Sequence, residues 1–124
     1  MKITIVGAGP AGLYAAILLR RARPDLEIEV LEQNAPDATF GFGVVFSDEA
    51  LGFLKADDPQ TADLIEPHMM RWSDIHVVHQ GRRIAIDGVG FAGIGRLQLL
   101  QLLQDRAAAL GITPRYHARL DDPL

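Results

Sequence analysis

The sequence predicts an α/β fold in which strands and helices alternate along the chain. A β-branched run at residues 3–6 is typical of a buried parallel strand, and it ends at a glycine-rich turn. Residues 10–23 are rich in helix-forming side chains, and Pro24 ends this stretch. A second apolar run, residues 27–31, follows directly. Strand, turn, helix and strand in this order form a βαβ unit with a right-handed crossover.

The turn after the first strand has the spacing G-x-G-x-x-G, and its residues are Gly7, Ala8, Gly9, Pro10, Ala11 and Gly12. Gly7 permits the tight turn, Gly9 leaves the backbone open to a pyrophosphate, and Gly12 allows the helix to pack close to the strand. The start of the helix adds free N–H groups and a partial positive charge. The turn is therefore predicted to bind the pyrophosphate of a dinucleotide.

An acidic residue follows the second strand at the spacing found in dinucleotide-binding folds. Glu32 lies 20 residues after Gly12 and is expected to accept hydrogen bonds from the adenosine ribose. Its charge opposes a 2′-phosphate, so FAD or NAD is favoured over NADP in this fold. The alternative is a plain turn followed by a surface carboxylate, but the matching strands and helix argue against it.

The chain continues with a long excursion, residues 33–95, before helical periodicity returns. Ser47 is predicted to cap one short helix, and a second begins near Asp58. Residues 75–79 and 83–86 have the alternation of a β-hairpin.

The last part of the chain repeats the helix–strand pattern. Leucine spacing predicts a helix over residues 96–110, and Gly111 is suited to cap its end. The segment 112–120 is predicted to be the third parallel strand.

Composition excludes several classes of function. The net charge of −4 gives no basic field for nucleic acid. Without cysteine, the chain has no disulfides, thiolate metal sites or thiol nucleophiles. His76 and His79 would lie on opposite faces of a strand, so no metal site is expected. Glycine and proline interrupt the longest uncharged stretch, residues 3–19, so we expect no membrane span and a cytoplasmic protein.

Three motifs resemble FAD-dependent aromatic monooxygenases. Residues 6–13, VGAGPAGL, resemble the opening of flavoproteins of the glutathione-reductase type. Two more selective motifs resemble the salicylyl-CoA and anthraniloyl-CoA hydroxylases: residues 40–48, FGFGVVFSD, and residues 90–96, GFAGIGR. The similarity covers most of the chain.

The resemblance implies a Rossmann-like FAD-binding domain of the glutathione-reductase type. Its parallel sheet would carry a β-hairpin and helical excursion between the second and third Rossmann strands. The whole chain, residues 1–124, is then a partial FAD-binding domain. Its parts are the βαβ unit 1–32, the excursion 33–95, and the helix and strand 96–120.

The resemblance also implies further cofactor-binding residues. Arg96 occupies the place of an arginine that contacts FAD, and a cation there can pair with the pyrophosphate. Gly43 and Val44 lie in the segment that passes near the ribityl chain and flavin ring. Gln33 is a candidate beside Glu32, although the superfamily often has a basic residue at that place.

The function implied by the resemblance is hydroxylation of an aromatic substrate. NAD(P)H would reduce the FAD, and the reduced flavin would react with O₂ and hydroxylate an electron-rich ring, with an aromatic acyl-CoA thioester as the implied substrate. Arg82 and Arg83 are weak candidates for contacts to CoA phosphates. The sequence identifies no catalytic residue and no oligomeric state.

The hydroxylases of this family are much longer, so the chain is interpreted as an N-terminal fragment that is inactive alone. Two other functions fit the βαβ unit. One is a binding module for FAD or another nucleotide without catalysis. The other is a different Rossmann NAD(P) or FAD oxidoreductase, although a dehydrogenase would normally continue with a second βαβ half.

Overall fold

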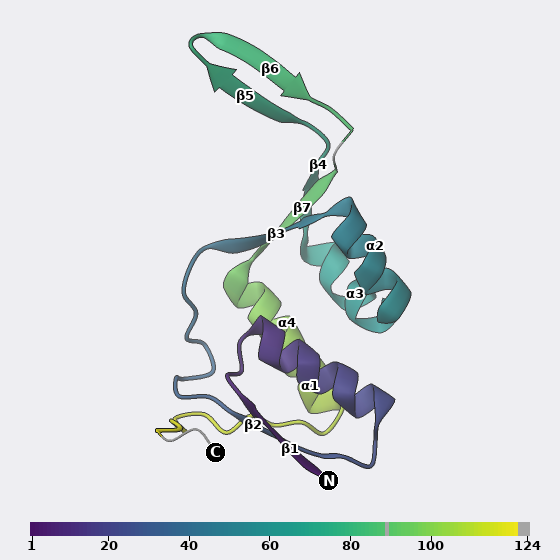
Figure 1. Ribbon diagram of the computed structural model, residues 1–124, viewed down its shortest axis with the longest axis vertical. Coiled ribbons are helices and arrows are strands. Elements are labelled where there is room, and N and C mark those ends of the chain that lie inside the picture. Colours follow the sequence, from purple (N-terminus) through teal and green to yellow (C-terminus); the bar gives the residue numbers. More distant parts are fainter. Residues whose placement is uncertain (89, 122–124) are drawn as a thin grey trace. The chain divides into compact units, whose positions relative to one another are not determined.

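The computed structural model describes residues 1–88 and 90–121. The chain divides into two compact units (Figure 1). Unit 1 consists of Met1–Gly41 and Arg96–Leu124, and unit 2 consists of Phe42–Gly95.

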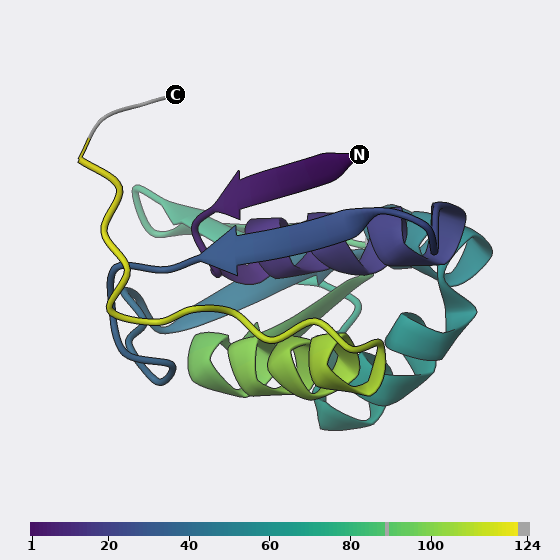
Figure 2. The same cartoon turned by 90° about the horizontal axis from the view of Figure 1, so that it is seen from below.

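Unit 1 is built from two parallel strands and two helices, which are β1 (Lys2–Val6), α1 (Pro10–Ala22), β2 (Glu27–Leu31) and α4 (Arg96–Ala109). Figure 2 shows the arrows of β1 and β2 pointing the same way, as expected for a βαβ unit. Helix α1 packs against β2 and α4. The apolar side chains buried between these elements include Leu13, Ile17, Val30, Leu99, Leu103 and Ala107.

Strand β1 is less covered than the sequence predicts. Ile3, Thr4 and Ile5 are only half-buried, and the Val6 side chain is 63% exposed. Among the described strands, β1 pairs with β2 alone.

The prediction of a third strand over residues 112–120 is wrong. Arg115 makes two backbone hydrogen bonds, of 2.8 and 2.9 Å, to the residues on either side of Leu31, which gives one isolated parallel bridge. Beyond this bridge the parallel register is lost, because the Ala118 N–H donates to the Glu32 carbonyl in place of the His117 N–H, and His117 has a φ of 55°, outside the extended region. The segment therefore follows β2 without forming a strand.

The helix predicted over residues 96–110 is confirmed as α4. Its leucines at helical spacing are buried, as the periodicity requires. Gly111 follows the helix with a φ of 75°, a left-handed conformation that glycine adopts without steric cost.

Unit 2 contains antiparallel strands and short helices. In chain order these are β3 (Gly43–Ser47), α2 (Asp48–Asp57), α3 (Pro59–Ile65), the 3₁₀ helix η1 (Glu66–His68), β4 (Met70–Trp72), β5 (Ile75–His79), β6 (Arg82–Ile86) and β7 (Phe91–Gly95). Strands β3, β7 and β4 form one sheet in that order, and β5 and β6 form a separate hairpin. None of the three strands of this sheet was predicted from the sequence.

The predicted Ser47 cap, the helix start near Asp58 and the hairpin of unit 2 are confirmed. The Ser47 hydroxyl accepts a hydrogen bond from the Ala50 N–H at 3.2 Å, and the Asp58 carboxylate accepts one from the Thr61 N–H at 3.2 Å. In the hairpin, the two residues of the turn, 80 and 81, both have positive φ, as a type I′ turn requires.

No helix in the described ranges is long and apolar enough to cross a membrane.

Candidate functional site

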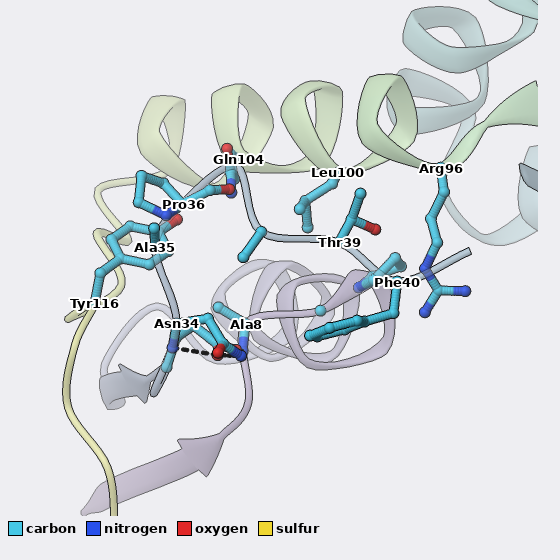
Figure 3. A pocket seen from close by; sticks show the side chains of 14 residues that line it. Ala8, Asn34, Ala35, Pro36, Thr39, Phe40, Arg96, Leu100, Gln104 and Tyr116 are labelled. Atoms are coloured by element: carbon cyan, nitrogen blue, oxygen red, sulfur yellow. Dashed lines mark hydrogen bonds between the residues drawn. The ribbon is translucent and has the colours of Figure 1, made fainter. Parts of the chain in front are cut away.

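A pocket in unit 1 lies where the first turns of α1 and α4 face the loop that follows β2 (Figure 3). Its walls are the glycine-rich turn, loop residues from 32 to 40, three residues of α4 and Tyr116. In Figure 3, Arg96 lies at one end of the pocket, whereas Asn34 and Tyr116 lie at the other. The pocket therefore has two ends of different chemistry.

The three glycines of the glycine-rich turn differ in their steric surroundings. Gly7 has a φ of 103°, and its N–H donates to the Leu31 carbonyl at 2.7 Å, which ties the turn to the end of β2. A methyl group at Gly12 would overlap the Gly7 carbonyl oxygen, so only glycine fits there. A methyl group at Gly9 would meet no atom within 4 Å. The backbone of Gly9 is thus open to the pocket.

The Arg96 end of the pocket has a positive field. Helices α1 and α4 both begin at the pocket, and neither has an acidic residue in its first turn. No acidic residue on either helix therefore offsets the partial positive charge of its start. Arg96 is half-buried, and no carboxylate of the described residues pairs with it. A cation at the start of a helix is unfavourable unless an anion balances it, so this end suits an anionic group.

The opposite end of the pocket carries a fixed carboxylate. Oε2 of Glu32 accepts a hydrogen bond from the Ala8 N–H at 2.9 Å. Oε1 accepts two hydrogen bonds from Asn34, from the backbone N–H at 2.8 Å and from Nδ2 at 2.9 Å. Burial by itself raises the pKa of Glu32, but the hydrogen bonds from Asn34 and Ala8 outweigh it and hold the pKa below its usual value. Glu32 is therefore ionised at neutral pH.

Two contacts distant in sequence complete the walls. The Gln104 Nε2 donates to the Pro36 carbonyl at 2.7 Å and fixes the loop against α4. The Ala118 N–H donates to the Glu32 carbonyl at 2.8 Å, which keeps Tyr116 at the pocket. Burial raises the pKa of the Tyr116 hydroxyl, and the charge of Glu32 raises it further.

The sequence missed Asn34, Gln104 and Tyr116 as pocket residues. Asn34 carries a local signal, because an asparagine two residues after a strand-end carboxylate can donate to it. Gln104 and Tyr116 carry none, because each reaches the pocket only through tertiary contacts.

The structure brings together only some of the predicted cofactor-binding residues. Those that line the pocket are Ala8, Gly9, Pro10, Glu32 and Arg96. Gly7 and Gln33 line a separate hollow beside β1, and Ala11 and Gly12 lie within α1. Gly43 and Val44 belong to unit 2.

Unit 2 has an apolar hollow on one face of its three-stranded sheet, and Gly43 and Val44 line it. The register pairs Gly43 with Gly95 and Val45 with Gly93. Three of these four neighbouring positions are therefore glycines without a side chain. Val45 is 59% exposed, and Met70, opposite Gly93, is 77% exposed.

One wall of this hollow is aromatic. The Trp72 ring stacks on Phe91, with ring centroids 6.0 Å apart. A methyl group at Gly93 would approach the Trp72 ring to 3.2 Å, so a side chain there would crowd the ring. A floor of glycines beside stacked rings is a surface suited to a flat apolar group.

In the part of the chain that the structure describes, no three metal-binding side chains are grouped. His76 is paired with Ala85 and His79 with Arg82 across the hairpin. The two histidines therefore lie on opposite faces of β5.

Residues 5–65 match a protein family described as an NAD(P)-binding Rossmann-like domain. The match includes the glycine-rich turn and Glu32. The chain therefore contains a Rossmann-like segment, in agreement with the parallel pairing of β1 and β2.

The chain is similar to curated monooxygenases over nearly all of its length. It is 48% identical over 123 residues to a salicyloyl-CoA 5-hydroxylase of a Streptomyces species, which is 99% of this chain and 24% of that enzyme. It is 31% identical over 112 residues to a 3-hydroxy-4-methyl-anthranilyl-[aryl-carrier protein] 5-monooxygenase of Streptosporangium sibiricum, covering 90% of this chain and 32% of that enzyme. The resemblance predicted from the three motifs is confirmed. The chain spans about a quarter to a third of the length of these relatives.

A solved structure shares the fold. The tetrameric form of 2-methyl-3-hydroxypyridine-5-carboxylic acid oxygenase superposes with a TM-score of 0.78 at 21% identity. The superposition covers 94% of this chain and 31% of that one.

Proposed function

We propose that this chain is part of the FAD-binding domain of a flavin-dependent monooxygenase. Nearly the whole chain is similar to about a quarter of a salicyloyl-CoA 5-hydroxylase. The observation that carries the proposal is the unit 1 pocket. It combines an open glycine turn, two helix starts, an unpaired arginine and a fixed carboxylate.

The two ends of the pocket fit the two polar parts of an adenine dinucleotide. Glu32 is ionised and takes a ribose hydroxyl as its donor. The starts of α1 and α4, together with Arg96, take the pyrophosphate. The open backbone at Gly9 lets the pyrophosphate approach closely.

The remaining predicted contacts belong to unit 2. We assign Gly43 and Val44 to the flavin ring and its ribityl chain, because the hollow that they line is apolar and its glycines leave room for a flat group. Gln33 stays a weaker candidate for the adenosine end, because its side chain lines the separate hollow beside β1.

Bound FAD would supply the redox chemistry, with NAD(P)H as the electron donor and O₂ as the oxidant. The residues that line the unit 1 pocket would position this cofactor. The proposed substrate is a small aromatic acyl group on a thioester carrier. The support is that the names of two relatives specify an acyl-CoA and an aryl-carrier protein.

We further propose that residues 1–124 are one partial FAD-binding domain of the glutathione-reductase type, in which residues 33–95 are inserted between Rossmann elements. Since the relatives are three to four times longer, hydroxylation is proposed for the longer protein and not for this chain alone.

Two alternatives differ in their expected ligand. A binding module without catalysis would retain FAD but have no hydroxylase activity in any longer form. An NAD-dependent oxidoreductase would retain NAD in preference to FAD, and the match to an NAD(P)-binding family is the observation in its favour.

The first test is retention of FAD by the purified chain. Gel filtration after incubation with FAD should leave the absorption bands of oxidised flavin with the protein. Gly9→Ala is the matched control, because its methyl group disturbs no protein atom but occupies the site of the pyrophosphate. We expect this variant to fold normally and to retain about tenfold less flavin. Retention of NAD but not FAD would replace the proposal with the dehydrogenase.

A further inference from the structure

We infer that Asn34 is a positioning residue that orients the Glu32 carboxylate for the nucleotide before the nucleotide binds. This inference rests on the proposed function, because it concerns how the same pocket recognises the ribose.

The contacts of Glu32 lead to this inference. Asn34 donates twice to Oε1, whereas Oε2 receives one hydrogen bond, from the Ala8 N–H. A carboxylate has about four acceptor sites, two on each oxygen. Asn34 therefore fills Oε1, and the free acceptor site is on Oε2, the oxygen that also holds the glycine-rich turn. A ribose hydroxyl would bind at that site.

Asn34 is itself held in place. Its backbone carbonyl oxygen accepts a hydrogen bond from the His117 N–H at 3.3 Å, so the Asn34 backbone is tied to the segment that carries Tyr116. From this anchored backbone, the N–H and the side-chain amide of Asn34 both donate to Oε1 and keep the Glu32 rotamer fixed without the nucleotide. Binding then does not need to order the carboxylate, and affinity increases for that reason.

No positively charged side chain of the described residues holds the Glu32 carboxylate in place. Among residues 1–88 and 90–121, no lysine, arginine or histidine forms an ion pair with Glu32. One ionisable group that interacts with Glu32 is Tyr116. Its raised pKa keeps the Tyr116 hydroxyl neutral through the physiological range. The backbone N–H groups of Asn34, Ala8 and Gln33 and the Asn34 side-chain amide are thus the donors that stabilise the charged form of Glu32 and lower its pKa.

The test compares the 124-residue chain with three variants by titration with FAD from about pH 4 to about pH 8. Asn34→Ala removes the amide, and Asn34→Asp replaces it by an isosteric acid that repels Glu32. Gln101→Ala removes an exposed amide on α4 outside the pocket and is the control.

We expect Asn34→Ala to bind FAD about tenfold more weakly at neutral pH, because one hydrogen bond to a charged group is lost. Asn34→Asp should be weaker still, and Gln101→Ala unchanged. The pH below which affinity falls should move upward in both Asn34 variants, because Glu32 then protonates more easily. A purely structural role for Asn34 would not move this limit.

Two results would overturn the inference. One is wild-type affinity in Asn34→Ala. The other is a weaker affinity with an unmoved pH limit and a lower melting temperature, which would mean that Asn34 only stabilises the fold. If the wild-type chain retains no FAD, the proposed function fails instead. The Glu32 pKa, followed by carboxyl ¹³C NMR in the free chain, then tests the Asn34 contact by itself: we expect a higher pKa in Asn34→Ala, and an unchanged pKa rejects it.

Discussion

The two units of this chain present different kinds of surface to a ligand. The unit 1 pocket is lined by polar groups held by hydrogen bonds, as the contacts of Glu32 show. The hollow of unit 2 is apolar, and its floor consists of glycines on paired strands. A charged, hydrogen-bonding ligand group fits the first surface, and a flat apolar group fits the second.

The units also differ in how their surfaces are built. Unit 1 places Gly7 and Glu32 on the turn and strand end of one βαβ unit, so short stretches of chain determine the geometry. Unit 2 aligns Val45 with Gly93 across a sheet, and this pairing depends on the register of distant strands. Local motifs therefore reveal the first surface, whereas only the folded chain reveals the second.

The largest expected effect is that of Gly12→Ala in unit 1. The new methyl group would overlap the Gly7 carbonyl, and backbone cannot move aside as a flexible side chain can. We expect the free energy of unfolding of unit 1 to fall by about 3 kcal/mol, measured by urea denaturation. Gly9→Ala is the control, with open space around the added group. Equal stability of the two variants would contradict the close approach of α1 to the turn.

The next effect is expected for Arg96→Gln. Removing the one charged side chain at the positive end of the pocket should weaken FAD binding about tenfold in isothermal titration. The dependence of affinity on salt concentration should also become shallower. Arg23→Gln removes an equal charge from an exposed ion pair with Asp25, away from the pocket. If both variants lost affinity equally, the effect would be one of net charge, and Arg96 would have no place in the site.

A smaller effect is predicted for the pH dependence of stability. The folded pKa of Glu32 lies below its ordinary value of 4.5, so ionised Glu32 stabilises unit 1 above that value. This contribution is lost as the pH falls through the folded pKa. The stability of Glu32→Gln should therefore lie below that of the wild type at neutral pH and approach it in acid. Urea denaturation at several pH values measures the difference, and a constant difference would exclude a role for the charge.

The smallest effect is expected in unit 2, for Gly52→Ala. Gly52 lies inside α2, and an added methyl group meets no atom within 4 Å. Alanine should raise the melting temperature, with a gain of about 0.5–1 kcal/mol, because glycine costs more entropy in a helix. FAD retention should be unchanged, whereas a loss of retention would show that α2 affects the nucleotide pocket.

The sequence by itself determined the elements that depend on local backbone chemistry. The ligand contacts of Gly9 and Glu32 stay predictions. The glycine-rich turn before α1, the cap at Ser47, the short helix beginning near Asp58 and the leucine period of α4 were all confirmed. Each depends on dihedral preferences, on a side chain bonding within a few residues, or on one period of hydrophobicity. Such signals are contained in a short window of sequence.

Tertiary structure alone decided the rest. Strand β7 is glycine-rich and has weak strand propensity, so its strand conformation depends on its partners β3 and β4. The segment 112–120 was predicted to be a strand, but the register against β2 is lost at His117, whose φ is positive, and a single bridge to β2 remains. Gln104 and Tyr116 became pocket residues through contacts with distant chain segments. A contact between distant segments leaves no periodic trace in either one, and for that reason only the fold could place these residues.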